Sequence, residues 1–174
     1  MEVILDNGLL SKMYDADTIQ LKSLEWRATQ QKIVFTNGVF DLLHVGHIDY
    51  LAKAARLGQK LIIGLNSDAS VRALKGINRP VNDQYSRAAL LAALYFVDGV
   101  VIFEELTPQQ LIASLLPDVL VKGSDYQINC IAGAEDVIIN GGSVQTIDLV
   151  QGYSSTRIIE KIWSQRDVLE QPEA

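Results

Sequence analysis

Residues 32–57 place a strand, a tight turn and the start of a helix in immediate succession, and no other stretch constrains the fold as much. The apolar residues 33–35 lead into Asn37-Gly38, which breaks the strand, and a helical pattern begins near His44. A turn of this kind directs unpaired backbone N–H groups and the positive end of a helix dipole at one point in space. The stretch therefore predicts a site for a phosphate group.

His44 and His47 lie three positions apart, so they share one face of the predicted helix. They are the only histidines among the 174 residues. Gly46 lies between them and costs about 1 kcal/mol relative to alanine inside a helix, so it is best explained where another group approaches the backbone closely. Two histidines at a helix start can be ordinary surface residues, but this setting favours contact with a ligand.

Apolar runs alternate with helical patterns along the whole chain. Strands are expected at residues 33–35, 61–65, 99–103, 118–122 and 144–148, and helices at residues 17–30, 44–57, 69–74, 83–95, 107–116 and 132–140, with a last helix opened by residues 152–157. Five strands separated by helices predict an α/β fold with a doubly wound, five-stranded parallel sheet. The expected organisation is an N-terminal helical extension (residues 1–31), one domain (residues 32–164) and a flexible tail (residues 165–174).

Ligands of such sheets bind beyond the carboxyl ends of the strands, and this rule brings four polar loops together. The loops hold residues 37–47, 66–68, 123–126 and 152–156. Residues 75–82 contain glycine, proline and the cations Lys75 and Arg79, a composition that predicts a mobile loop. Arg87 follows on the next helix. Each cation alone could be a surface charge, but together they favour a lid that holds phosphates.

The composition argues against several classes of partner and chemistry. With a net charge of −6 and no basic face, nucleic acid is not expected as a partner. Cys130 is the single cysteine, which excludes an internal disulfide and fits the reducing cytoplasm. No signal peptide and no apolar run of transmembrane length are present, so no membrane partner is expected. Neither a Gly-x-Gly-x-x-Gly nor a Gly-x-x-x-x-Gly-Lys-Ser/Thr motif occurs, so dinucleotide-dependent dehydrogenases and P-loop enzymes are not supported.

The remaining inventory suits nucleotidyl transfer. That reaction needs in-line alignment of an attacking phosphate and donors that neutralise growing negative charge. His44, His47, the backbone N–H groups and the lid cations provide both. A phosphate nucleophile is already ionised at pH 7, which matches the absence of a Ser/His/Asp arrangement. Two histidines make a poor zinc site, so Mg²⁺ held mainly by substrate phosphates, without a protein metal site, is the expected metal.

Residues 36–47 resemble the His-x-Gly-His signature of the cytidylyltransferase-like nucleotidyltransferases. The resemblance continues through residues 74–87, 121–126 and 152–156, and it is strongest to the family members that make ADP-heptose from ATP and heptose 1-phosphate. It implies a Rossmann-like nucleotidyltransferase fold, ATP and a sugar 1-phosphate as substrates, a cytoplasmic homo-oligomer such as a dimer, and a product used for lipopolysaccharide core or another surface glycan.

The same resemblance assigns roles to individual residues. It implies that His44 and His47 stabilise the triphosphate in the transition state and that Lys75 contacts phosphates from the lid, so these three are the expected catalytic residues. The nucleotide-binding set it implies is Thr36, Asn37, Gly38, Phe40, Gly46, Arg87, Lys122, Gly123, Asp125, Tyr153, Ser154, Ser155 and Thr156. The substrate-binding set it implies is Asp41, Asn66, Asp68 and Arg79.

Two positions depart from the patterns of related groups. Leu149 stands where cytidylyltransferases that act on glycerol 3-phosphate carry an arginine, and Val39 stands where the heptose group usually has a cysteine that in-line transfer does not require. Two alternatives stay open: a cytidylyltransferase for glycerol 3-phosphate or another polyol phosphate, and a non-catalytic nucleotide-binding module. Several heptose enzymes are fused to a sugar kinase, and 174 residues leave no room for one, so we expect the kinase on a separate protein.

Overall fold

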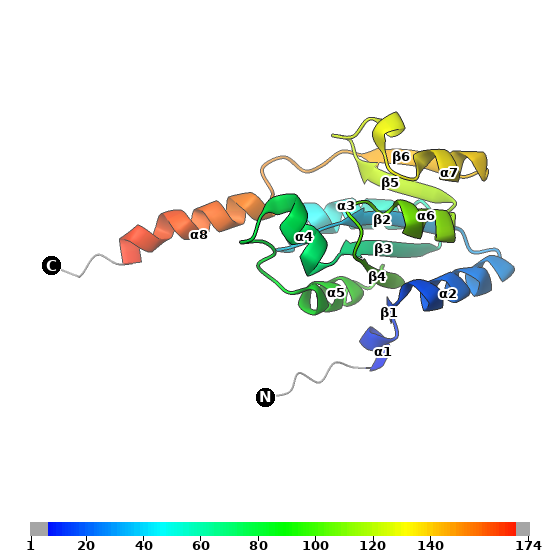
Figure 1. Ribbon diagram of the computed structural model, residues 1–174, viewed down its shortest axis with the longest axis horizontal. Coiled ribbons are helices and arrows are strands. Elements are labelled where there is room, and N and C mark those ends of the chain that lie inside the picture. The colour runs from blue at the N-terminus through cyan, green and yellow to red at the C-terminus, as the bar shows by residue number, and fades with distance from the viewer. Residues whose placement is uncertain (1–6, 170–174) are drawn as a thin grey trace.

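A parallel sheet of six strands forms the centre of the computed structural model, which describes residues 7–169 (Figure 1). The strands are β1 (Met13–Tyr14), β2 (Ile33–Gly38), β3 (Lys60–Asn66), β4 (Gly99–Phe103), β5 (Val119–Gly123) and β6 (Ser143–Ile147). Their order is β1-β4-β3-β2-β5-β6, and all neighbours are parallel. From β2 the chain steps outward to β3 and β4, then crosses back to place β5 on the other side of β2. The strand order therefore reverses between β2 and β5, where doubly wound sheets bind ligands.

The α/β parallel architecture is confirmed, but the predicted count of five strands is wrong. The additional strand is β1, which pairs with β4 through Met13↔Val100 and Tyr14↔Val101. The Val100 N–H donates to the Lys12 carbonyl at 2.8 Å just before this pairing. A strand of two residues is too short to produce a period-two pattern, so tertiary pairing alone defines it.

Helices cover both faces of the sheet and divide the core in two. They are α1 (Asn7–Leu10), α2 (Ala16–Ala28), α3 (Val45–Ala55), α4 (Asp68–Lys75), α5 (Gln84–Ala92), α6 (Gln109–Leu115), α7 (Ala134–Ile139) and α8 (Ser155–Leu169), with a 3-10 turn η1 (Ile128–Cys130). α3 and α5 pack on one face, and α2, α6 and α7 on the other. Successive strand residues point to opposite faces, so Val34 joins the first core while Ile33 and Phe35 join the second.

α2 packs against the sheet, although it precedes the first predicted strand. The Asp15 carboxylate caps it by accepting a hydrogen bond from the Thr18 N–H at 2.8 Å. In turn, the Thr18 hydroxyl oxygen accepts a hydrogen bond from the Asp15 N–H at 3.1 Å. Ile19 and Trp26 are buried in the second core, where each large apolar side chain contributes about 1.5–3 kcal/mol. Residues 16–28 are therefore part of the packed structure.

α8 leaves the body of the molecule and projects to one side (Figure 1). It extends to Leu169, so residues 165–169 of the predicted tail are helical, and residues 170–174 lie outside the described residues. No helix within residues 7–169 has the length and apolar character needed to cross a membrane.

Candidate active site

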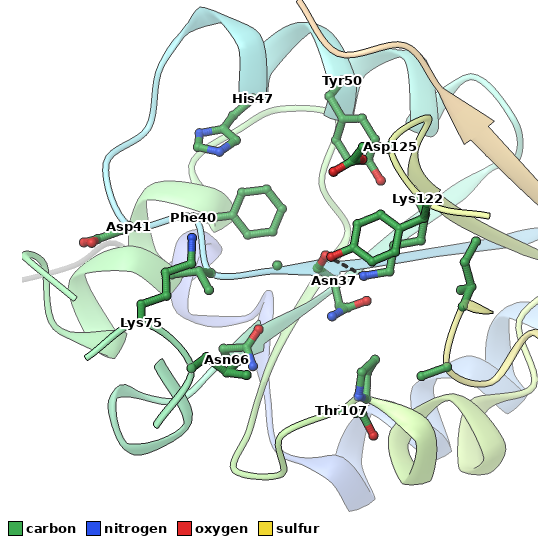
Figure 2. Close-up of a pocket in the computed structure, with 18 of the residues that line it drawn as sticks. Asn37, Phe40, Asp41, His47, Tyr50, Asn66, Lys75, Thr107, Lys122 and Asp125 are labelled. Carbon is green, nitrogen blue, oxygen red and sulfur yellow. Dashed lines mark hydrogen bonds between the residues drawn. The ribbon is translucent and has the colours of Figure 1, made fainter. Parts of the chain in front are cut away.

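A cavity of about 640 Å³ opens at the carboxyl ends of the strands, beside the point where strand order reverses. Its lining consists of residues 37–41, His47 and Tyr50 on α3, Asn66, Leu74, Lys75, Arg79, residues 106–108, Lys122, Gly123, Asp125, Tyr126, residues 130–132, Leu149 and Ser155. In Figure 2, His47, Phe40, Lys75 and Asp41 lie on one side, and Tyr50, Lys122 and Asp125 on the other.

The signature turn, residues 39–44, connects β2 to α3. Phe40 has φ +45°, a left-handed conformation that bulky residues rarely adopt and that persists mainly at functional sites. His44 is the N-cap of α3, and its Nδ1 accepts a hydrogen bond from the His47 N–H at 3.3 Å. Because Nδ1 is the acceptor, the proton of neutral His44 lies on Nε2, which is then a donor.

The two imidazole rings stack on each other with centroids 3.7 Å apart and an interplanar angle of 17°. Burial lowers the pKa of His47 to about 4, with further lowering by His44 and Lys75. Burial also lowers the pKa of His44. Both rings are therefore neutral at pH 7, and they can stabilise a phosphate through N–H donation but not through a full positive charge.

Gly46 allows the start of α8 to approach α3. A Cβ atom at Gly46 would lie 3.1 Å from both His44 Nδ1 and Tyr153 Cβ. Ser155 Oγ donates to the Leu42 carbonyl at 3.0 Å, which joins the start of α8 to the signature turn. The predicted Tyr153–Thr156 segment therefore lies beside the histidine pair, although Ser155 is its one residue in the cavity lining described here.

Asp41 holds the second half of the predicted mobile loop against the signature turn. Its carboxylate accepts hydrogen bonds from Arg79 Nε at 2.5 Å, the Val81 N–H at 2.7 Å and the Asn82 N–H at 3.1 Å. Lys75 precedes this tethered part as the last residue of α4, and it is exposed at the cavity. Two cations of residues 75–82 therefore reach the cavity: Arg79, which the Asp41 carboxylate holds, and Lys75, whose side chain has no hydrogen bond within the described residues.

Arg87 occupies a different place from the phosphate contact that the resemblance implies. Its guanidinium is fully buried behind the cavity and donates to the carbonyls of Val39, Asn66 and Asn82, at 2.7, 2.9 and 3.0 Å. It also pairs with Asp68 Oδ1 at 2.6 Å. Neither Arg87 nor Asp68 is among the lining residues, so their direct contact with ligands stays a prediction.

Lys122 reaches the cavity from β5 on the opposite side. Its ammonium donates to the Asn37 carbonyl at 3.4 Å and lies 5.2 Å from the centre of the Tyr126 ring (Figure 2). Burial lowers the pKa of Lys122 to about 8, and the charge of Asp125 opposes that shift. Lys122 therefore carries a positive charge at pH 7 that is lost in mildly alkaline solution.

Most of the predicted site residues meet at this cavity. Those in its lining are Asn37, Gly38, Phe40, Asp41, His47, Asn66, Lys75, Arg79, Lys122, Gly123, Asp125 and Ser155. Thr36 lies buried behind it, where its hydroxyl bonds the Tyr50 hydroxyl at 2.7 Å. The predicted residues outside the lining are Thr36, His44, Gly46, Asp68, Arg87, Tyr153, Ser154 and Thr156.

Sequence reasoning missed Tyr50 and residues 106–108, which also line the cavity. Residues 106–108 follow β4, so the rule that collected the other loops at the carboxyl edge predicts them too when it is applied to every strand. Tyr50 lies one helical turn after His47 and shares its face. Burial raises the pKa of Tyr50 to about 12, so its hydroxyl keeps its proton.

Comparison with known proteins agrees with this geometry. A family model described as cytidylyltransferase-like matches residues 35–161. The bifunctional protein HldE of Campylobacter jejuni subsp. doylei is 58% identical over 132 residues, which are 76% of this chain and 28% of the relative. The HldE protein of Cronobacter sakazakii is 56% identical over 136 residues, which are 78% of this chain and 29% of the relative. The chain thus spans less than a third of the length of these curated relatives.

A solved structure has a similar fold. The crystal structure of the lipopolysaccharide core biosynthesis protein from Thermoplasma volcanium matches with a TM-score of 0.56 and 29% sequence identity, over 71% of this chain and 99% of that one. The family match, residues 35–161, contains the signature turn, the lid and the β5 side of the cavity. On the strength of this match, the chain belongs to the cytidylyltransferase-like family.

Proposed function

We propose that this chain transfers AMP from ATP to heptose 1-phosphate, releasing pyrophosphate and forming ADP-heptose. The observation that carries the proposal is the stacked pair His44 and His47 at the N-terminus of α3, beside a cavity that Lys75, Arg79 and Lys122 also reach. Donors and cations around one cavity suit a reaction in which negative charge develops on a triphosphate.

In this reaction an oxygen of the sugar phosphate forms a bond to the α-phosphorus of ATP. The bond from that phosphorus to the oxygen bridging to the β-phosphate breaks, and pyrophosphate leaves with the electron pair. The N–H donors of His44 and His47 and the N-terminus of α3 stabilise the added charge on the triphosphate. Lys75 would close the lid side over the phosphates.

Proton transfer by the protein is not required, because the attacking phosphate is already ionised at pH 7. The low pKa of His47, about 4, accords with a donor that stays neutral through the reaction. A general base would instead need a pKa near the working pH. The histidines therefore act in this proposal as donors to phosphate oxygens.

Magnesium, the metal expected for phosphate substrates, fits as part of the substrate. Within residues 7–169, no group of three or more His, Cys, Asp and Glu side chains is placed to hold a metal. The Asp41 carboxylate is occupied by the lid, and Asp68 is paired with Arg87. We propose that Mg²⁺ enters bound to the phosphates of ATP.

The choice of heptose 1-phosphate as the acceptor of AMP rests on the resemblance and on Leu149. This apolar residue lines the cavity and would lie 3.2 Å from a Cβ atom at Gly123, at the position where cytidylyltransferases for glycerol 3-phosphate carry arginine. The similarity to a lipopolysaccharide core biosynthesis protein supports a product destined for a surface glycan. We further propose that residues 32–164 carry the catalytic groups of a cytoplasmic enzyme that works as a homo-oligomer, with residues 1–31 as an N-terminal extension whose β1 and α2 pack with the same sheet.

The test is pyrophosphate release in the presence of Mg²⁺. ATP, CTP and GTP are each combined with heptose 1-phosphate, glycerol 3-phosphate and ethanolamine phosphate. We expect turnover with ATP and heptose 1-phosphate. Turnover with CTP and a polyol phosphate would show that the proposed substrates are wrong but that the proposed nucleotidyl transfer is right. Tight nucleotide binding without turnover of any pair would instead support a non-catalytic binding module.

A further inference from the structure

The Asp41 carboxylate is committed to protein groups on both oxygens. Oδ1 accepts the backbone N–H groups of Val81 and Asn82, and Oδ2 accepts Arg79 Nε. The side chain is 1% exposed, although its residue borders the cavity. A sugar hydroxyl could bind this carboxylate only by displacing one of these short contacts, so direct substrate binding does not explain its geometry.

Arg79 has donors left over after it binds Asp41. A guanidinium carries five N–H donors in a planar fork, and Asp41 uses the one on Nε. The two Nη groups make no hydrogen bond to any residue within the described range 7–169, and Arg79 lines the cavity. Fixing Nε fixes the plane of the fork, which suits bidentate binding of a phosphate.

The surroundings of this fork favour an anion. Lys75 lies on the same side of the cavity, and its charge contributes to the lowered pKa of His47. The Asp41 carboxylate neutralises part of the charge of Arg79 but leaves its Nη donors free of hydrogen bonds within the described residues. Asp41 is thus situated to act on a ligand through Arg79.

We propose that Asp41 is a positioning residue that aims the Arg79 guanidinium at a phosphate group of the bound nucleotide. The proposal rests on the proposed nucleotide site but does not depend on turnover or on the identity of the acceptor. It replaces the direct substrate contact that the resemblance assigns to Asp41 with an indirect one.

The test uses Asp41→Asn, which changes one contact selectively. The asparagine oxygen can still accept the Val81 and Asn82 N–H groups, while its NH₂ group faces Arg79 Nε and can no longer accept from it. Binding of inorganic pyrophosphate and of ATP is measured by titration calorimetry with Asp41→Asn, Arg79→Met and the double variant. Glu25→Gln, in the exposed Lys22–Glu25 pair of α2, is the matched control for loss of a carboxylate.

We expect Asp41→Asn and Arg79→Met each to weaken pyrophosphate binding about tenfold, and the double variant to bind no more weakly than Arg79→Met alone. Independent action would instead multiply the two losses to about a hundredfold, and this outcome would overturn the proposal. Unchanged binding by Asp41→Asn, or no binding of pyrophosphate or ATP by the unaltered protein, would overturn it as well.

A second variant covers the case in which Asp41→Asn does not fold, as judged by its unfolding temperature. Asp41→Glu keeps the charge but moves the carboxylate by one methylene, so it should shift the fork and weaken pyrophosphate binding several-fold, and only when Arg79 is present. An equal loss in the Arg79→Met background would contradict the proposal. Because every readout is a binding constant, failure here is distinguishable from failure of the proposed reaction, which is read by pyrophosphate release.

Discussion

The two walls of the cavity hold their cations in different ways. The lid wall (Asp41, Lys75 and Arg79, with Arg87 behind them) contains arginines fixed by carboxylates and main-chain carbonyls at 2.5–3.0 Å. The β5 wall (Lys122, Asp125 and Tyr126) contains a lysine held by one carbonyl at 3.4 Å and an aromatic ring. Arginine stays charged at any working pH, whereas the buried lysine has a pKa of about 8.

This contrast separates what a charged residue contributes to the stability of the fold from what it contributes to ligand binding. On the lid wall, the arginine contacts contribute to the geometry of the fold, so their removal should disturb structure as well as binding. On the β5 wall, the charge is costly to bury and adds little to stability, so its removal should affect binding alone. Mutations on each wall test this division.

The largest effect is expected at His47, beside the lid wall. His47→Ala removes a donor whose interaction grows as charge develops, so kcat should fall about 10²–10³-fold while the dissociation constant of ATP changes by about threefold or less. Steady-state kinetics and calorimetric titration of ATP measure the two quantities. Equal losses in kcat and in ATP affinity would mean that His47 binds the ground state only.

Arg87→Met should cause the next largest effect, on stability. It leaves the buried carbonyl of Asn66, the part-buried carbonyls of Val39 and Asn82 and the Asp68 carboxylate without the Arg87 donor, so the free energy of unfolding should fall by about 3 kcal/mol. Lys122→Met is the matched change on the β5 wall, and it should change the free energy of unfolding by less than about 1 kcal/mol. Urea denaturation compares both variants with the unaltered protein, and similar losses would erase the difference between the walls.

Lys75→Ala should slow turnover without loosening the fold. Lys75 is exposed at the end of α4, and within the described residues its side chain has no hydrogen bond or ion pair. We expect kcat to fall about 10–30-fold, because a cation near the transferred phosphates is lost, with no change in the unfolding temperature. Normal turnover in this variant would rule out a closing lid.

The smallest effect concerns pH. Lys122 has a lowered pKa of about 8, so it is mostly protonated at pH 7.5 and mostly neutral at pH 9. If the charged form alone binds phosphate, the KM for ATP should rise about eightfold between these values. Lys122→Arg stays charged and should show no such rise. A parallel rise in both proteins would assign the titration to another group.

Strong local patterns made most of the fold predictable. The apolar runs of β2, β3, β4, β5 and β6 gave the parallel sheet, and the sequence Asn66-Ser67-Asp68 indicated the start of α4, where Ser67 is the N-cap. β1 was not predicted, because a strand of two residues has no periodic pattern in the sequence. Its pairing with β4 depends on contacts about ninety positions away in the chain, which no local window contains.

The candidate site was predictable where residue type and strand ends coincide, as at Asn37 and Lys122. It was less predictable where a charged residue is buried. Arg87 reads as a surface or phosphate-binding cation because arginine is rarely buried, yet three carbonyls from separate segments converge on it. Such convergence is a property of the assembled fold, and the sequence of α5 alone does not contain it.

The contacts of Arg87 also distinguish the backbone around the cavity from the side chains that line it. Its partners at Val39, Asn66 and Asn82 are main-chain oxygens, which every amino acid possesses. A mutation of Val39 can therefore replace the side chain without removing the bond to Arg87, whereas the side chains of Asn66 and Asn82 also donate hydrogen bonds, to Ser70 Oγ and to the Asp41 carbonyl. Val39 also lines the cavity, so position 39 is a suitable starting point for evolving or engineering substrate preference while the Arg87 contacts stay in place.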